Sequence, residues 1–142
     1  MPDTATITTI KEVPLPDVWA MRQQVMYPAE TLEFVKLEAD AAGQHWGLYK
    51  EGALVSVISV FVEGSTLQFR KFATVAAQQG KGHGSVLLQY VMDWAAQHPI
   101  KSIWCNARTT ATGLYQKFGM QPVGETWQKY GLEFIKMEKQ LL

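Results

Sequence analysis

The sequence predicts a single α/β domain built around a mixed sheet. Its apolar residues repeat with the two-residue period of strands in some segments and with the helical period in others. The segments follow one another as strand, helices, three strands, helix, strand, helix and two strands. With 142 residues the chain has the length of one domain, which we expect to span residues 1–142.

The first segments predict a strand followed by helices. Residues 4–12 alternate between β-branched and other side chains and predict an opening strand. Asp17 follows two prolines and predicts the cap of a helix that runs to about residue 27. We expect a short helical turn over residues 31–36 and a polar, mobile connection over residues 38–43.

The middle of the chain predicts a meander of three strands. Residues 46–49 and 53–62 are apolar runs separated by 50–52, where a glycine supplies the positive φ of a hairpin turn. Residues 64–65 mark the next turn and residues 67–75 the third strand.

The second half alternates helices and strands. A helix is predicted over residues 86–97, a short strand over 101–105 and a helix from 111 to 118. Residues 122–129 and 132–139, joined across Tyr130-Gly131, predict a closing hairpin. We expect the helix over residues 86–97 to cover the sheet with one face, which consists of Val86, Leu87, Tyr90, Val91, Trp94 and Ala95.

The composition excludes several classes of protein. A hydrophobic share of 47% and five Trp indicate a packed core rather than disorder. Thirteen basic residues balance thirteen acidic ones, so we expect neither a nucleic-acid nor a membrane partner. The single cysteine excludes an intrachain disulfide, and no apolar signal region or membrane-spanning run is present. We therefore expect a cytoplasmic protein.

A glycine-rich loop lies between the third strand of the meander and the long helix. Its glycines lack the Cβ atoms that would keep a ligand away from the backbone, and a helix N-terminus follows. Such a loop favours a phosphate or pyrophosphate without a metal ion. It consists of Gln79, Gly80, Lys81, Gly82, His83, Gly84 and Ser85.

The spacing of the glycines excludes two nucleotide-binding motifs. A Walker loop needs Ser or Thr directly after its lysine, but Lys81 precedes Gly82. A dinucleotide-binding fingerprint needs a third glycine where this chain has Leu87. Without further motifs, a plain turn before a helix remains an alternative interpretation of the loop.

Two motifs together resemble the GNAT superfamily of acyl-CoA-dependent N-acetyltransferases. Gln79-x-x-Gly82-x-Gly84 resembles the (Q/R)xxGx(G/A) signature of that family. The segment from Asn106 to Met120 resembles its second motif, NAxxxAxxFYxxxGF, at the expected separation. This resemblance implies a mostly antiparallel mixed sheet of about six to seven strands flanked by helices. Arg22-x-x-Val25-x-x-Pro28 and other short segments further resemble the small, bacterial, single-domain ElaA-like branch.

The resemblance implies a site for acetyl-CoA as co-substrate, with no metal. The loop from Gln79 to Ser85 would hold the pyrophosphate. Backbone at Phe72 and Thr74 would pair with the pantetheine arm, and a strand amide near Ala73 would stabilise the oxyanion. Asn106 would contact the pantetheine arm and Phe118 would pack beside the cofactor. Asn106 at a strand end is also explained as a helix cap.

Tyr115 falls on the position of the family's general acid, which protonates the departing thiolate. On an apolar helix face it is equally explained as a core tyrosine. Cys105 has no histidine near it in sequence, so we expect a buried, inert thiol rather than an acyl-enzyme nucleophile.

The general base is not predicted by any pattern. The fourth strand carries no carboxylate where many relatives have a glutamate. Candidates by residue type alone are Glu38, Asp40, His45, Glu63 and Glu133; His45 is also explained as a packed, hydrogen-bonded core residue.

Three functions therefore remain. The first is an acetyl-CoA-dependent N-acetyltransferase acting on a small-molecule or protein amine. The second is a non-catalytic acyl-CoA-binding module. The third is a protein-interaction domain, since the terminal hairpin has an unpaired edge that could also form a homodimer.

Overall fold

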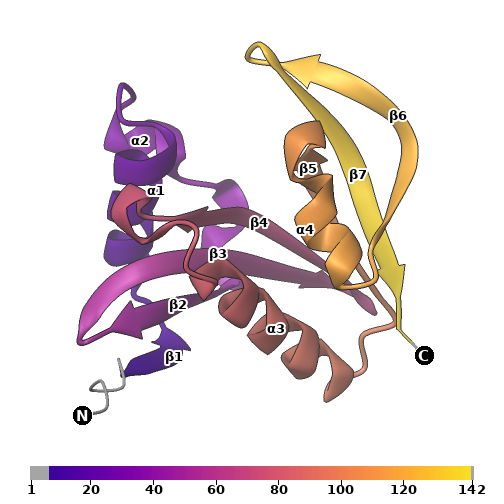
Figure 1. Cartoon of the computed structure of the whole chain (residues 1–142), viewed down its shortest axis with the longest axis horizontal. Coiled ribbons are helices and arrows are strands. Elements are labelled where there is room, and N and C mark those ends of the chain that lie inside the picture. Colours follow the sequence, from indigo (N-terminus) through magenta and orange to yellow (C-terminus); the bar gives the residue numbers. More distant parts are fainter. Residues whose placement is uncertain (1–6, 142) are drawn as a thin grey trace.

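The computed structural model describes residues 7–141, which form a seven-stranded sheet with helices on both faces (Figure 1). The predicted α/β class and order of elements are confirmed. The strands and helices are β1 (Thr8–Glu12), α1 (Leu15–Met26), α2 (Leu32–Val35), β2 (Gln44–Lys50), β3 (Ala53–Glu63), β4 (Thr66–Thr74), α3 (His83–Ala96), β5 (Ser102–Arg108), α4 (Thr112–Lys117), β6 (Gln121–Lys129) and β7 (Leu132–Gln140). Short 3-10 turns are η1 (Glu38–Ala42), η2 (Ala76–Gln78) and η3 (Thr109–Ala111). The first part of the predicted opening strand, residues 4–6, lies outside the described residues.

The sheet is mixed and mostly antiparallel. Its strands are ordered β1-β2-β3-β4-β5-β7-β6, and every neighbouring pair is antiparallel except β4 and β5. β4 and β5 can be parallel because the connection between them contains α3. A short turn could join only antiparallel strands. No helix among residues 7–141 is long and apolar enough to cross a membrane.

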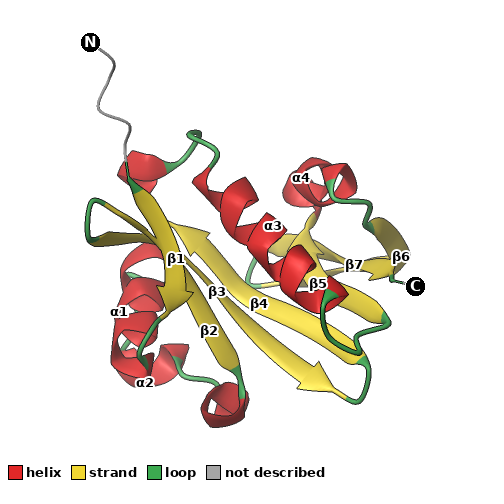
Figure 2. Ribbon diagram, turned by 90° about the horizontal axis from the view of Figure 1, so that it is seen from below, coloured by secondary structure: helices red, strands yellow, loops and turns green. Residues whose placement is uncertain are grey.

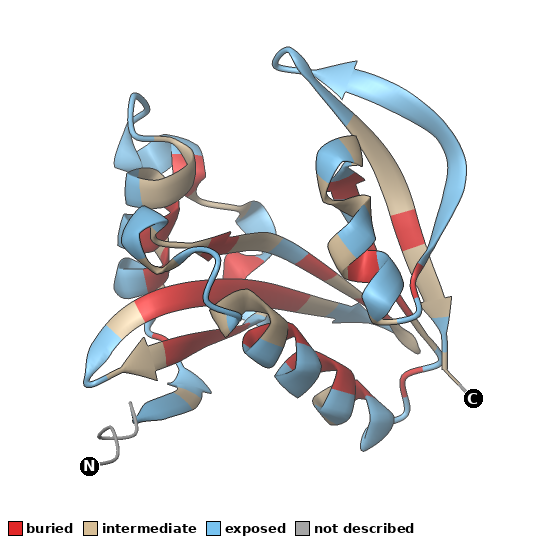
Figure 3. Ribbon diagram, in the orientation of Figure 1, coloured by how far each residue is buried: buried red, intermediate tan, exposed pale blue. Residues whose placement is uncertain are grey.

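Helices lie on both faces of the sheet, and the hydrophobic residues buried beneath them form two separate clusters (Figures 2 and 3). The larger cluster lies under α3, whose fully buried residues are Leu87, Leu88, Val91 and Ala95. On the opposite face Met21 of α1 packs with Val57 and Ala73. Successive β3 residues serve opposite faces because side chains alternate along a strand.

The predicted buried face of α3 is partly wrong. Val86 and Tyr90 are 50% and 36% exposed, while Leu88 and Met92 are buried in their place. The helix begins at His83 rather than at residue 86, and the buried stripe is rotated toward Leu88. Both sets share the helical period, so periodicity alone did not separate them.

Two expectations near the N-terminus are corrected by the backbone. Pro14 is the N-cap of α1, and Asp17 lies in the first turn of the helix without a side-chain capping bond. Pro16 fits because the first helical N–H groups need no helical acceptor. Residues 38–43, expected to be a polar, mobile connection, contain the 3-10 turn η1, in which Asp40 is buried.

A buried polar network explains why η1 is ordered. Arg22 is fully buried and binds both carboxylate oxygens of Asp40, at 2.8 and 2.9 Å. Arg22 also donates to Ser59, which contacts His45 Nδ1 at 2.8 Å. His45 Nε2 lies 2.9 Å from the Asp40 carbonyl, which only accepts, so Nε2 carries a proton and donates to it. The network joins α1 and η1 to the sheet.

Candidate active site

The glycine-rich loop leads directly into the N-terminus of helix α3. Gly82 is the N-cap of α3 with φ 84°, a left-handed conformation that strains any residue with a Cβ. No side chain caps the helix. The first N–H groups, those of His83, Gly84 and Ser85, have no acceptor within the helix and carry the positive end of its dipole.

Side chains fix this loop to the end of β4. Gln79 Nε2 donates to the Thr74 carbonyl at 3.0 Å. A Cβ on Gly84 would lie 3.3 Å from Cζ of Phe72, so glycine lets α3 approach β4 closely.

Burial, and then the charges of Lys50 and Lys81, lower the pKa of His83, which is therefore neutral at pH 7. Gly80 and Lys81 are exposed on the loop.

β4 and β5 are hydrogen-bonded only near their beginnings. In residues 7–141 their register runs from Thr66 opposite Ser102 to Gln68 opposite Trp104 and ends there. β5 stays paired with β7 as far as Arg108, so the two halves of the sheet diverge beyond Gln68. The edge of β4 facing β5 is consequently open from Phe69 onward.

A bulge in β4 lies at the same place. Val57 opposes Ala73 and Ser59 opposes Arg70, so β4 has one residue more than β3 between these pairs. Lys71, within that interval, has φ 53°. A bulge leaves a residue unpaired and turns the strand, which exposes backbone groups at the cleft.

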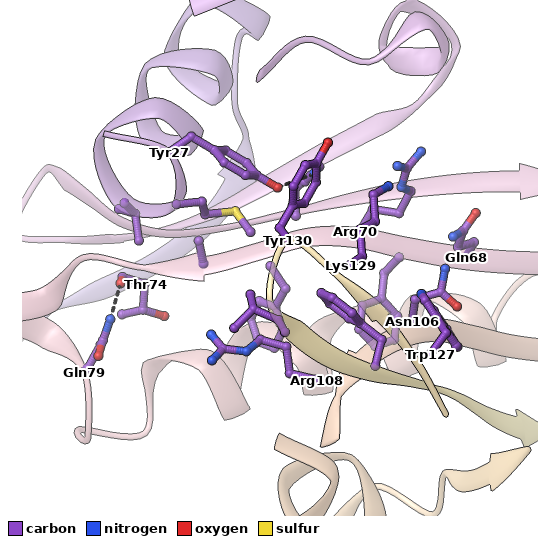
Figure 4. A pocket seen from close by; sticks show the side chains of 18 residues that line it. Tyr27, Gln68, Arg70, Thr74, Gln79, Asn106, Arg108, Trp127, Lys129 and Tyr130 are labelled. Atoms are coloured by element: carbon purple, nitrogen blue, oxygen red, sulfur yellow. Dashed lines mark hydrogen bonds between the residues drawn. The ribbon is translucent and has the colours of Figure 1, made fainter. Parts of the chain in front are cut away.

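A cleft of about 550 Å³ fills the space between the diverging strands (Figure 4). It contains several of the predicted site residues, namely Phe72, Ala73, Thr74, Gln79 and Asn106. Further walls come from the end of α1 and from the β6–β7 hairpin, through Tyr27, Trp127, Tyr130 and Phe134. A second hollow of about 600 Å³ lies between α3 and α4 and is lined by Ser85 and Phe118 among others.

Asn106 is an exposed residue of β5 that lines the cleft. Its alternative interpretation as a helix cap is wrong, because Arg108 precedes η3 and Ala111 is the N-cap of α4. The position fits a contact to a ligand lying between the strands.

Tyr115 is buried on α4, with its ring centroid 5.7 Å from that of the cleft residue Phe69. Tyr115 itself is not among the cleft-lining residues. Burial, with a smaller contribution from Cys105, raises the pKa of the phenol well above its ordinary value of 10.0. The phenol therefore remains protonated at neutral pH, as a proton donor must.

Cys105 is buried, as predicted. The side chain is 2% exposed, and burial raises its pKa to about 12. A thiol that stays protonated is a poor nucleophile.

None of the five candidate bases lines the cleft. Asp40 and His45 belong to the buried network with Arg22, which confirms the interpretation of His45 as a packed, hydrogen-bonded residue. Glu133 is exposed and accepts from Thr109 at 3.0 Å. No group of three His, Cys, Asp or Glu in residues 7–141 could hold a metal ion.

Sequence reasoning missed the cationic residues of the cleft. Arg70, Lys71, Arg108 and Lys129 line it, from three different strands. No local pattern marks them, because they come together only through the parting of β4 from β5.

The fold combines a mixed sheet that opens between β4 and β5 with a glycine-rich loop and the uncapped N-terminus of α3. Residues 18–141 match the family model described as "Acetyltransferase (GNAT) domain". The chain therefore belongs to the GNAT acetyltransferase family, and the resemblance inferred from the two motifs is confirmed.

One curated relative is the uncharacterized N-acetyltransferase YitI of Bacillus subtilis, 26% identical over 132 residues, which are 87% of this chain and 89% of the relative. Similar solved structures include a presumed N-acetyltransferase of Lactobacillus plantarum, 21% identical with a TM-score of 0.84 over 95% of this chain and 99% of that one. Escherichia coli ElaA is 17% identical, with a TM-score of 0.75 over 94% and 99%. A GNAT family acetyltransferase of Elizabethkingia anophelis, solved with acetyl-CoA bound, is 18% identical, with a TM-score of 0.73 over 94% and 98%. These structural similarities show the fold.

Proposed function

We propose that this protein transfers the acetyl group of acetyl-CoA to a primary amine. The observation that carries the proposal is the open edge of β4, which borders the same cleft as Gln79 of the glycine-rich loop. An extended ligand can pair with the strand edge while its phosphates reach the helix N-terminus. Acetyl-CoA has that shape, and the Elizabethkingia relative binds it.

The residues of the loop fit a pyrophosphate. Free N–H groups of His83, Gly84 and Ser85 face a position that no capping side chain occupies. Cβ atoms built at Gly80 and Gly82 would meet no protein atom within 4 Å, so the space beyond them is open. Lys81 would add a positive charge at the edge of the proposed pyrophosphate site.

The pantetheine arm would follow β4. The backbone of Phe72 and the N–H of Thr74 would pair with its amides, while the Thr74 carbonyl already accepts from Gln79. Asn106, on β5, would contact the arm from the other side of the cleft. Phe118 would pack beside the cofactor at the second hollow, which it shares with Ser85.

In the proposed reaction the neutral amine attacks the thioester carbon, so a C–N bond forms and the C–S bond breaks. A β4 amide near Ala73 would donate to the carbonyl oxygen as that atom gains negative charge. Tyr115 would give its proton to the departing thiolate as the C–S bond breaks. Its raised pKa keeps the phenol protonated until that step. The attacking nitrogen would release one proton to water, since no described carboxylate lines the cleft, and the Tyr115 phenolate would regain a proton from water.

The test is amine-dependent release of free CoA, measured together with the acetylated amine by mass spectrometry. An acetyltransferase yields both products in equal amounts. Acetyl-CoA binding without either product, across small amines and lysine peptides, would favour the non-catalytic binding module.

The interaction-domain alternative rests on β6, an edge strand whose nine residues are all exposed. Sedimentation over a range of protein concentrations tests whether this edge forms a homodimer. A dimer is compatible with the proposed enzyme; a dimer without acetyl-CoA binding would favour the interaction domain.

A further inference from the structure

The cleft concentrates positive charge in a protein whose overall charge is zero. Thirteen Lys and Arg balance thirteen Asp and Glu in the whole chain. Four cations line the cleft, and no carboxylate is among its described lining residues. Such a site attracts anions and raises the energy of a bound cation.

The cations of the cleft form no ion pair with any residue from 7 to 141. The ion pairs within residues 7–141 are Arg22–Asp40, Lys36–Glu33 and Lys136–Glu138. Of the cleft cations, only Lys71 is engaged by a hydrogen bond, from its Nζ to the Tyr27 hydroxyl at 2.6 Å.

The other three cations divide into two groups. In Figure 4 Arg108 points toward the end of the cleft where Thr74 and Gln79 lie, which is the side of the phosphate-binding loop. In the same view Arg70 and Lys129 lie away from that end, and Lys129 Nζ is 5.4 Å from the centroid of the Tyr130 ring. Arg70 and Lys129 are thus the cations left for the second substrate.

The walls around this second region are largely aromatic. Tyr27 comes from the end of α1, and Trp127 and Tyr130 come from the β6–β7 hairpin. Trp127 is stacked on Phe134, with ring centroids 6.0 Å apart. These rings offer an apolar surface to the body of a substrate while the cations hold its charge.

We propose that the acceptor is a primary amine that also carries an anionic group, a carboxylate or a phosphate, bound by Arg70 and Lys129. The inference rests on the proposed acetyltransferase function and specifies its substrate class. Arg70 presents a planar fork of donors that suits either anion. The same charges disfavour amines with additional positive charges, such as polyamines, through repulsion.

The experiment compares amines in matched pairs that differ only in the anion. The pairs are 4-aminobutyrate with 4-aminobutyramide, phenylalanine with phenylalaninamide, and 2-aminoethyl phosphate with ethanolamine; spermidine represents the polycations. We expect kcat/KM for the anionic member to exceed that of its neutral partner by about tenfold or more in at least one pair. The carboxylate and phosphate pairs distinguish the two anions.

Variants connect this preference to the residues. Arg70→Gln and Lys129→Gln should each raise KM for the preferred anionic amine about tenfold, so that the ratio within the pair falls toward one. Lys101→Gln is the matched control, because Lys101 is exposed and precedes β5 at the end where β4 and β5 are paired. It removes the same charge and should leave the ratio unchanged.

Calorimetric titration with acetyl-CoA separates failure of the inference from failure of the proposed function. Absence of acetyl-CoA binding by the unmodified protein would overturn the proposed function. Binding with acetylation of neutral amines or spermidine in preference to the anionic ones, or of no anionic amine, would overturn the inference alone. Loss of acetyl-CoA affinity in Arg70→Gln would also overturn it, since Arg70 would then hold the cofactor.

Discussion

Replacing Gly82 by alanine tests the phosphate-binding loop. At φ 84° an alanine pays for its Cβ with about 1–2 kcal/mol of strain, so Tm should fall by about 3–8 °C for a chain of this size. A Cβ here would meet no protein atom within 4 Å, so the methyl group projects into the space assigned to the pyrophosphate. We expect the affinity for acetyl-CoA to fall at least tenfold, or about 1.4 kcal/mol.

Gly84→Ala is the matched control, with the same methyl group two residues later. Gly84 lies within α3 without a positive φ, so alanine gains about 0.5–1 kcal/mol of helix stability. The contact of its Cβ with Phe72 at 3.3 Å offsets part of this gain, because the half-buried ring must shift slightly. Tm should remain within about 3 °C of the original. Acetyl-CoA should still bind, because alanine keeps the backbone N–H that would face the pyrophosphate and its Cβ points at Phe72.

The assay combines isothermal calorimetry with thermal unfolding of both variants. A loss of affinity in Gly82→Ala is assigned to the loop only if the variant is folded at the titration temperature. Full affinity in folded Gly82→Ala would refute the assignment of this loop to the phosphates. Equal losses in both variants would also contradict it, because the argument depends on the different surroundings of the two glycines.

Three other predictions concern the reaction and the buried network. Tyr115→Phe should lower kcat by about 10²–10⁴-fold with unchanged affinity for acetyl-CoA; equal turnover would remove Tyr115 as the acid. Because burial raises the pKa of Tyr115 above 10.0, kcat should rise with pH as the bound amine loses its proton and should show no descending limb below pH 10. A descending limb near pH 8 would contradict the assignment. Burial alone would raise the pKa of Asp40, but hydrogen bonds from Arg22, Leu37 and Trp19 outweigh it and lower the pKa from 3.8 to about 2. The carboxylate therefore adds about 2 kcal/mol of stability above pH 4 that is lost as the pH falls through 2. Asp40→Asn should lose about 3–5 kcal/mol at pH 7, measured by urea unfolding, and should lack this acid-dependent loss; an unchanged stability would show that Arg22 tolerates burial without its partner.

The order of elements was predictable from the sequence because most segments have a local hydrophobic period and are bounded by turn residues. Gly52, Gly64 and Gly131 mark three of the turns, all with positive φ. The loop at Gly82 was likewise visible, since its glycines and the following helix are adjacent in sequence. The motif that contains Asn106 and Tyr115 indicated the family because its residues have the spacing of the family's second motif.

The charged environment of the cleft could not be predicted in the same way. Arg70 and Lys129 are separated by most of the second half of the chain and line the same cleft only because β7 lies between β5 and β6. The bulge around Lys71 also depends on the register of β3 against β4, which no local pattern specifies.

Asp40 was difficult for a different reason. A polar stretch between two apolar segments ordinarily lies in solvent, and this one includes two acidic residues. Burial of Asp40 depends on Arg22, which is eighteen residues away and on another element. Long-range pairs of opposite charge leave no periodic signal in the sequence.

The most direct test of the account is calorimetric titration of the unmodified protein with acetyl-CoA in the presence of a chelator, with ATP and NAD as controls. The account predicts saturable, metal-independent binding of acetyl-CoA at one site per chain and no comparable binding of ATP or NAD. A folded protein that does not bind acetyl-CoA would contradict it, and the loop from Gln79 to Ser85 would then be only a turn.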